Sequence, residues 1–239
     1  MPAIIDTISK WVDNDVRPIA DQYDQADEYP HELVEQMKEL GLFGATIGEE
    51  YGGLGLTSAI YAKIVIKVAA AWMAPSGIFN SHLIMASAIE RAGSEEQKQA
   101  FLKPMTRGEV RWCQGFSEPN AGSDLASIRT SAVDQGDHYL VNGSKIWTSY
   151  GDKSDWMYAL VRTDPDAPKH QGISLLLLDM HAEGVKAVPI DLISGKSSFC
   201  EVFFDNVVVP KANLIGELNG GWKLAKELLQ HERTAMSKF

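Results

Sequence analysis

The spacing of apolar residues changes abruptly near Val110, and this change limits the folds that the chain can adopt. Before Val110, apolar side chains such as Ile4, Ile8 and Trp11 recur every three or four residues, as on the buried face of an α-helix. After it, short β-rich runs alternate with turn-forming residues as far as Pro210, where a helical spacing returns. We therefore expect an α+β fold in which a helical domain precedes a β domain.

Two stretches in the helical part, residues 58–72 and 75–91, are rich in Ala, Ile and Met and are expected to be buried helices. Ser94 and Gln97 have the spacing of a capping box, in which each side chain bonds the other residue's backbone N–H, and they predict the start of a further helix. His82 stands on an apolar helix, and we interpret it as a hydrogen-bonded core or cleft histidine rather than a catalytic one.

The β-rich runs are expected to form a compact domain, with strands over residues 112–117, 138–141, 144–149, 156–163, 173–180 and 199–209. Asn142 and Gly143 stand between two of these runs, and Asn-Gly is a strong signal for a type I′ hairpin turn because both positions need a positive φ. Counting with a period of two then places Trp147 and Ser149 on one face of the following strand and Thr148 on the other.

Residues 116–124 combine turn formers, hydroxyl groups and carboxylates directly after an apolar run. Pro119 fixes its own φ and Gly122 tolerates a positive φ, so the chain should leave a strand there in a tight, irregular turn. The exposed amides of such a turn, with the hydroxyls of Ser117 and Ser123, are suited to bind an anionic or polar ring ligand. The alternative is an ordinary surface turn.

Composition favours a packed protein that avoids polyanions. With 22 Lys and Arg against 32 Asp and Glu, the formal net charge of -10 opposes binding to nucleic acid or to an anionic membrane. No signal peptide is visible at the start, and the longest apolar run, residues 173–178, is too short to span a bilayer. Cys113 and Cys200 lack the spacing of metal ligands, so a cytoplasmic protein with free thiols and no metal is expected.

Several motifs occur in order along the chain: Tyr51-Gly52-Gly53-Leu54-Gly55, the stretch from Phe116 to Asp124, Asn142-Gly143-Ser144-Lys145-Ile146-Trp147, Gly221-Trp222 and Glu232-Arg233. In this order and at these intervals they resemble the acyl-CoA dehydrogenase family. The resemblance implies an N-terminal helical domain at residues 1–110, a β-barrel-like middle domain at 111–215 and the first helix of a C-terminal helical bundle at 216–239. Because family members continue with further helices, we expect a fragment, or a chain completed by another polypeptide, that binds FAD poorly alone.

The resemblance implies FAD as cofactor and an acyl-CoA thioester as substrate, dehydrogenated to a trans-2-enoyl-CoA. The positions that match the family's cofactor contacts are Gln114, Phe116, Ser117, Gly122, Ser123, Trp147, Thr148 and Ser149. Ser123 also matches a contact to the pantetheine arm of the substrate. The residue types agree, since Trp147 offers a flat apolar face to the isoalloxazine ring and serine hydroxyls can bond its polar edge. Asp124 is expected to cap the turn or a following backbone N–H. Lys145 and Arg129 are expected to be solvated surface charges, with contacts to nucleotide phosphates as the alternative.

Glu232 is the candidate general base. Some members of the resembled family carry the base far along the C-terminal helical domain. Others carry it on the first long helix after the β domain, and Glu232 occupies this position. Its neighbours three and four residues away are all apolar: Leu228, Leu229, Ala235 and Met236. A carboxylate on such a stripe is expected to be desolvated, which raises its pKa toward the range of a general base. The alternative is a glutamate at a packing interface, paired with a cation from another helix or subunit.

The resemblance also implies partners. We expect an electron-transfer flavoprotein as acceptor and a homo- or hetero-oligomer, either a dimer or a tetramer, without nucleic acid or a membrane span. Two alternatives stay open. One is an oxygen-using flavoenzyme on the same scaffold, of the nitroalkane oxidase or flavin monooxygenase type. The other is a catalytically silent partner subunit that binds acyl-CoA without converting it.

Overall fold

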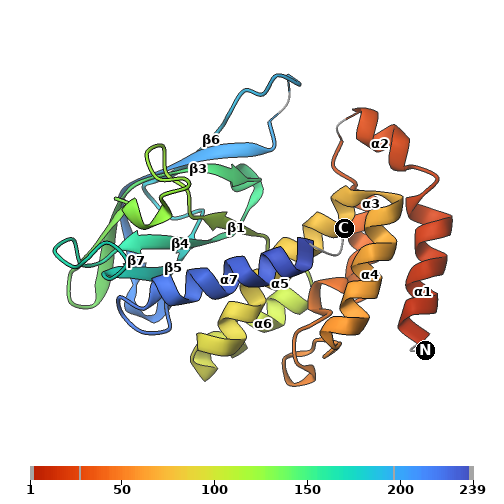
Figure 1. Cartoon of the computed structure of the whole chain (residues 1–239), viewed down its shortest axis with the longest axis horizontal. Coiled ribbons are helices and arrows are strands. Elements are labelled where there is room, and N and C mark those ends of the chain that lie inside the picture. The colour runs from red at the N-terminus through yellow and green to blue at the C-terminus, as the bar shows by residue number, and fades with distance from the viewer. Residues whose placement is uncertain (1–2, 27, 196, 237–239) are drawn as a thin grey trace. The chain divides into compact units, whose positions relative to one another are not determined.

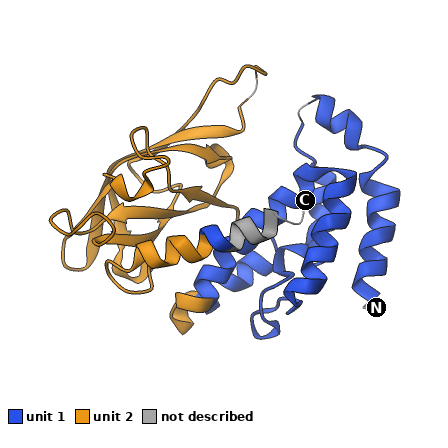
Figure 2. Ribbon diagram, in the orientation of Figure 1, with its two compact units in different colours: residues 1–90, 98–109, 229–239 blue, residues 91–97, 110–228 orange. Residues whose placement is uncertain are grey.

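The computed structural model describes residues 3–26, 28–195 and 197–236, with side chains described up to residue 230. The chain has the predicted α+β organisation, with helices first, then a large sheet and then a helix (Figure 1). It divides into two compact units (Figure 2). Residues 1–90, 98–109 and 229–239 form the helical unit, and residues 91–97 and 110–228 form the unit that contains the sheet.

The α-helices of the first 106 residues are α1 (Ala3–Trp11), α2 (Ala20–Ala26), α3 (His31–Glu39), α4 (Ser58–Ala71), α5 (Met73–Ala92) and α6 (Glu95–Thr106). A π-helical turn, Val12–Val16, follows α1. Both stretches that were expected to be buried helices are confirmed, because α4 and α5 coincide with them within one or two residues. The apolar face of α5 is almost completely buried at Phe79, Leu83 and Met85, where it contributes to the core of the helical unit.

The predicted capping box at the start of α6 is confirmed. The Gln97 N–H donates to Ser94 Oγ at 3.2 Å, and the Ser94 N–H donates to Gln97 Oε1 at 2.8 Å. The other side-chain atom of this glutamine, Nε2, donates to the carbonyl oxygens of Ala212 and Leu214 at 2.6 and 2.8 Å. Gln97 therefore caps its helix and also anchors the segment after the last long strand, a second role that the capping-box spacing does not reveal.

The sheet contains β1 (Trp112–Gly115), β2 (Ser131–Asp134), β3 (His138–Ser149), β4 (Trp156–Arg162), β5 (Ile173–Asp179), β6 (Val185–Pro189), β7 (Phe199–Pro210) and β8 (Leu214–Ile215). The strand order is β6-β7-β3-β2-β4-β5-β8, and β1 pairs in parallel with β4. Among the described residues the sheet ends at β6 and β8 without closing, so barrel-like describes it only loosely. Its core includes the completely buried Val141, Ala159, Leu176 and Val202.

The hairpin predicted at Asn142 and Gly143 is wrong, because both residues lie inside the single long strand β3. Asn142 pairs with Ser131 of β2, and the register against β7 shifts between Val141 and Gly143. The turn signal marks a β-bulge instead: Asn142 Oδ1 accepts the Asn206 N–H of β7 at 2.8 Å, and Gly143 adopts a φ of 140°. The strands β2 and β7, which pair with β3 on its two sides, therefore hold Asn142 and Gly143 in an extended strand.

The helix predicted after the β part is α7 (Gly221–Met236). Its first residue must be a glycine, because a Cβ atom on Gly221 would lie 2.5 Å from the carbonyl carbon of Ser174 in β5. On the described part of α7, Ala225 and Leu228 are buried, and Trp222 and Leu229 are half-buried. None of the helices in the described part of the chain is long and apolar enough to cross a membrane.

Candidate functional site

The predicted ligand-binding turn, residues 116–124, leaves the end of β1 in a tight loop. Glu118 and Ala121 exchange backbone hydrogen bonds of 3.1 and 3.0 Å, which close the loop over the two residues between them. Gly122 and Ser123 follow and are exposed. The turn is therefore as irregular as its composition predicted, and it offers a hydroxyl and a side-chain-free stretch of backbone to its surroundings.

The turn is joined to the second half of β3. The Ile146 N–H donates to the Ser117 carbonyl oxygen at 2.9 Å, and Thr130 Oγ1 donates to the Ser144 carbonyl oxygen at 3.0 Å. The structure thus brings together the two segments that carry most of the predicted cofactor contacts. Ser117 is half-buried at this junction.

A second bulge in β3 turns Trp147 out of the sheet. Lys145 and Thr148 are three positions apart on β3, yet their partners on β7 are only two positions apart. Trp147 has a φ of 61°, in the left-handed region, and 57% of it is exposed. Its ring meets the Phe199 ring edge-on, with centroids 6.3 Å apart. Because such a backbone conformation is strained for a residue with a Cβ atom, the neighbouring contacts must hold it in place.

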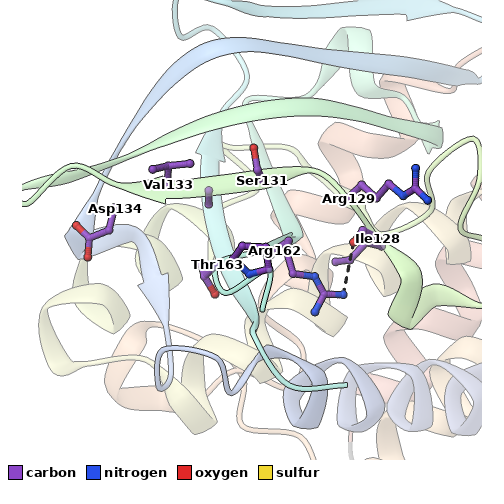
Figure 3. A pocket seen from close by; sticks show the side chains of 9 residues that line it. Ile128, Arg129, Ser131, Val133, Asp134, Arg162 and Thr163 are labelled. Carbon is purple, nitrogen blue, oxygen red and sulfur yellow. Dashed lines mark hydrogen bonds between the residues drawn. The ribbon is translucent and has the colours of Figure 1, made fainter. Parts of the chain in front are cut away.

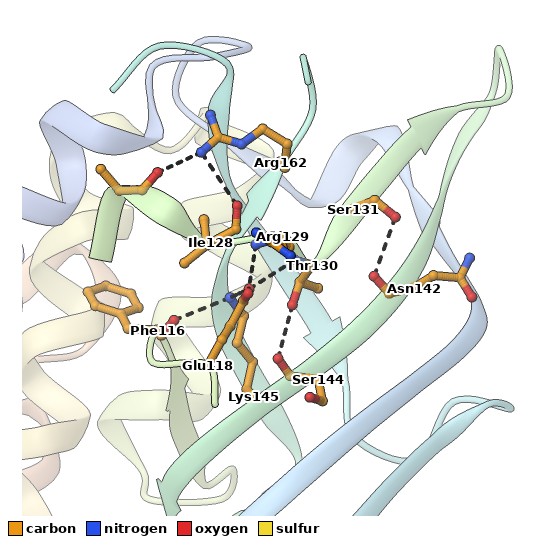
Figure 4. Close-up of polar contacts among 11 residues, drawn as sticks. Phe116, Glu118, Ile128, Arg129, Thr130, Ser131, Asn142, Ser144, Lys145 and Arg162 are labelled. Atoms are coloured by element: carbon orange, nitrogen blue, oxygen red, sulfur yellow. Dashed lines mark hydrogen bonds and ion pairs between the residues drawn. The ribbon is translucent and has the colours of Figure 1, made fainter. Parts of the chain in front are cut away.

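Lys145 is completely buried, so its prediction as a solvated surface charge is wrong. Its ammonium group donates to Glu118 Oε1 at 2.8 Å and to the Phe116 carbonyl oxygen at 3.2 Å (Figure 4). The burial of Lys145 could not be predicted from the sequence because of the bulge. Alternation counted back from the exposed Trp147 would place Lys145 on the exposed face, but the extra residue of the bulge reverses the phase of the strand.

Glu118 is the central acceptor of the network in Figure 4. Besides the Lys145 ammonium, its carboxylate accepts the backbone N–H groups of Arg129 and Thr130 at 2.6 and 2.9 Å. Burial alone would raise the pKa of Glu118, but the Lys145 charge and these donors outweigh it and hold the pKa below its usual value. Burial lowers the pKa of Lys145 to about 8, against the opposing influence of Glu118. Both groups are therefore charged at neutral pH.

Sequence reasoning missed this ion pair. Glu118 and Lys145 each stand inside one of the motifs quoted above, and their opposite charges are the signal that could have paired them. Arg129 is exposed, as predicted. Asp124 accepts a hydrogen bond from Ser127 Oγ at 2.6 Å and an ion pair from Lys169, and it makes no side-chain cap to a backbone N–H. Asp124 therefore stabilises the turn, as expected, through bonds to side chains and without a bond to a backbone N–H.

A pocket of about 430 Å³ lies beside β2 (Figure 3). It is lined by Ile128, Arg129, Ser131, Ala132, Val133, Asp134, Arg162, Thr163 and Pro165, and no predicted cofactor position is among them. The Arg162 guanidinium donates to the carbonyl oxygens of Ala126 and Gln171 at 2.7 and 2.8 Å. This charge therefore ties two loops together rather than facing a ligand.

The exposed Trp147 ring fits a flat, ring-shaped ligand, whereas its neighbour Thr148 faces the opposite, buried side of β3. The large Trp147 surface is exposed, although tryptophan is usually covered. Thr148 is 1% exposed, and its Oγ1 has no hydrogen-bond partner among the described residues. An unpaired buried hydroxyl is costly, so a partner for it is expected in the working protein. Ser149 is exposed and Thr148 is buried, as the alternation predicted, while Ile146, which it placed on the face of Thr148, is half-buried beside the bulge.

The remaining predicted site residues differ in how deeply they are buried. Gln114 is half-buried on β1, opposite Tyr158 of β4. The Phe116 side chain belongs to the interior, where its ring meets the Tyr158 ring edge-on at 5.8 Å, so only its backbone faces the turn network. The Glu232 side chain lies outside the described residues.

His82 has the structural role that the sequence predicted. It is buried, and its Nε2 lies 2.9 Å from the Met105 carbonyl oxygen, to which a neutral imidazole donates. Burial lowers the pKa of His82 to about 4, and the hydrogen bond to Met105 only partly opposes this. The ring is therefore neutral at physiological pH and serves packing.

Comparison with known proteins identifies the family. Residues 2–109 match the acyl-CoA dehydrogenase N-terminal domain, and residues 113–207 match the acyl-CoA dehydrogenase middle domain. The chain belongs to the acyl-CoA dehydrogenase family. This result agrees with the resemblance of the ordered motifs, and it makes the protein a member of a family of oxidoreductases.

Individual relatives and solved structures match most of the chain but extend beyond it. Acyl-CoA dehydrogenase FadE26 of Mycobacterium tuberculosis is 39% identical over 208 residues, which cover 86% of this chain and 51% of that protein. A glutaryl-coenzyme A dehydrogenase complexed with glutaryl-CoA has 31% identity and a TM-score of 0.91, over 99% of this chain and 61% of the other. The ChsE4–ChsE5 complex of Mycobacterium tuberculosis has 33% identity and a TM-score of 0.80, over 96% and 59%. The chain thus spans about half to three fifths of their lengths.

Proposed function

We propose that this chain supplies the flavin clamp of an FAD-dependent acyl-CoA dehydrogenase that converts an acyl-CoA thioester to a trans-2-enoyl-CoA. The clamp comprises residues 116–124 and 144–149. The proposal rests on the hydrogen bond between Ile146 and Ser117, which joins the two segments next to the exposed Trp147 ring. We retain 1–110, 111–215 and 216–239 as the proposed domain bounds.

Within the clamp, Trp147 would stack on the isoalloxazine ring, and the hydroxyls of Ser117 and Ser149 would bond its polar edge. Gly122 would let the backbone approach the pyrophosphate, since a Cβ atom there would meet no atom within 4 Å and the space in front of it is open. The proposed set is completed by Gln114, Phe116, Ser123 and Thr148. When bound, FAD supplies the hydride acceptor of the reaction.

The substrate and the base extend the proposal beyond the clamp. Ser123, which is exposed, would contact the pantetheine arm of the thioester. Glu232 would accept the α-proton as general base. Glu232 lies on the helix α7, one turn after the buried Leu228.

Partners and location follow from the same proposal. We infer that electrons pass to an electron-transfer flavoprotein and that the working protein is a homo- or hetero-oligomer, dimeric or tetrameric. The solved ChsE4–ChsE5 complex, which pairs two different chains, supports a hetero-oligomer as one form of this assembly. The two cysteines, both buried and free, agree with a cytoplasmic location.

The decisive experiment follows the flavin spectrum during anaerobic addition of acyl-CoA. The protein is purified together with any chain that accompanies it, loaded with FAD and titrated with acyl-CoAs of graded length. We expect bleaching of the oxidised flavin with the preferred substrate, and loss of this bleaching with retained FAD in Glu232→Gln. Bleaching at the unchanged rate in Glu232→Gln would refute the assignment of the base. Absence of FAD binding by the wild-type assembly would refute the proposed function itself.

A further inference from the structure

We propose that the buried Glu118–Lys145 ion pair is the positioning pair of the clamp: it holds the turn and β3 in the register that presents Ser117 and Trp147 to the same ligand. This inference rests on the proposed flavin site and adds to it two residues that would not touch the cofactor. It concerns how the site is kept in shape rather than which groups react.

Stability does not by itself explain a charged pair at this place. A buried ion pair can often be replaced by apolar residues of similar volume without loss of stability, because taking both charges out of water is costly. Here the charged groups also form hydrogen bonds, and these bonds have defined directions. Glu118 accepts the Lys145 ammonium and the N–H groups of Arg129 and Thr130, and the ammonium also donates to the Phe116 carbonyl oxygen. Apolar side chains of the same size would fill the space but would not select one register.

The register matters because of the bulge that follows Lys145. Trp147 has a φ of 61°, and this strained conformation persists only if both of its flanks are held. On the far side, Thr148 is paired with Cys200 of β7. On the near side, Lys145 is paired with Val202 of β7, and the Lys145 ammonium and the Ile146 N–H both bond carbonyl oxygens of the turn. Removal of the ion pair would leave the near flank with a single backbone hydrogen bond to the turn.

Other charged groups near the pair do not substitute for it. Arg162 adds a favourable charge interaction with Glu118, but its guanidinium is bonded to loop carbonyl oxygens. Its backbone N–H donates to the Thr130 carbonyl oxygen at 2.7 Å, which fixes the segment that carries two donors to Glu118. In the described part of the chain, Lys145 is therefore the side-chain cation that links Glu118 to β3.

The test compares the double variant Glu118→Gln/Lys145→Met with wild type. The glutamine amide oxygen would still accept one of the two backbone N–H groups that the carboxylate binds, and the methionine side chain would fill the space of the lysine stem without a charge. We expect a folded protein with a moderately lowered midpoint of thermal unfolding, FAD binding weakened about tenfold or more, and altered vibronic structure in the flavin spectrum. The control is Lys211→Met, which removes a lysine paired with Asp134 outside the clamp and should leave FAD binding unchanged.

A readout without cofactor makes the test independent of turnover. Hydrogen exchange of the Ile146 amide, measured by NMR in the FAD-free protein, should be about tenfold faster in the double variant, while exchange in β4 and β5 stays at the wild-type rate. If the double variant does not fold, Lys145→Met, in which Glu118 keeps its two backbone donors, is measured in the same way. Wild-type FAD affinity together with wild-type exchange at Ile146 would overturn the positioning role. Failure of the wild-type assembly to bind FAD would instead refute the proposed function on which the inference rests.

Discussion

The Lys145 ammonium lies 2.8 Å from the Glu118 carboxylate, and neither side chain has more than 8% of its surface exposed. This contact joins a turn that follows β1 to the middle of β3, two segments that are distant in the sequence. It also lies beside the bulge that exposes Trp147. A buried polar network thus supports the most exposed aromatic residue of the clamp.

The two single substitutions in this pair should differ in cost. Glu118→Gln leaves the buried ammonium without a counter-charge, so we expect it to lower the free energy of unfolding by about 3 to 5 kcal/mol. Lys145→Met should cost less, about 1 to 3 kcal/mol, because Glu118 keeps the N–H donors of Arg129 and Thr130. Urea unfolding at pH 7 measures both values. A larger loss for Lys145→Met than for Glu118→Gln would contradict this account of the network.

The buried His82 should make the protein sensitive to acid. Its pKa is lowered to about 4 in the folded state by burial, against about 6.5 in an unfolded chain, so the unfolded chain binds the proton first. The neutral His82 therefore does not reduce the free energy of unfolding above pH 6.5. As the pH falls from 6.5 toward 4, protonation of the unfolded chain lowers the free energy of unfolding by about 3 kcal/mol in total. In His82→Gln, whose amide can still donate to the Met105 carbonyl oxygen, this part of the pH dependence should disappear. Unfolding curves between pH 4 and 7 that are parallel for both proteins would exclude this role.

Gly143 should tolerate substitution much less well than Gly136. A Cβ atom on Gly143 would lie 2.7 Å from Thr130 Cα, and the residue has a φ of 140°, so Gly143→Ala should destabilise by about 3 kcal/mol or more. Gly136 also has a positive φ, 97°, but a Cβ atom there would meet no atom within 4 Å, so Gly136→Ala should cost about 1 to 2 kcal/mol. The midpoints of thermal unfolding of the two variants measure this difference. Gly143→Ala introduces a steric contact in addition to backbone strain, whereas Gly136→Ala introduces backbone strain alone. Equal shifts would show that the approach of Thr130 is unimportant.

Trp147 should matter for flavin binding and little for folding. Because 57% of it is exposed, Trp147→Ala should change the free energy of unfolding by no more than about 1 kcal/mol. Loss of the stacking surface should weaken FAD binding by about tenfold or more. Val208→Ala is a matched control, since Val208 is equally exposed at 57% and lies outside the clamp on β7. A titration with FAD in which both variants bind as wild type does would remove Trp147 from the proposed site.

Local signals predicted much of the fold. The apolar spacing located α4 and α5, and the pair Ser94 and Gln97 marked the start of α6, because these signals depend only on residues a few positions apart. The short strands β2, β6 and β8 were missed, and the segments on either side of Asn142 and Gly143 were joined by the wrong connection. A turn motif has no fixed outcome when strands on both sides supply hydrogen bonds, as β2 and β7 do here.

The sequence by itself determined the α+β class, the family and the two segments of the proposed clamp. Each of these can be recognised from motifs of residues that are adjacent in the chain. Only the tertiary structure decided that Lys145 is buried against Glu118 and that Trp147 is turned outward. Both depend on the bulge in β3, which exists because β7 pairs with either side of it. One additional residue opposite a neighbouring strand reverses which side chains point inward, and that register is a property of the assembled sheet rather than of the strand alone.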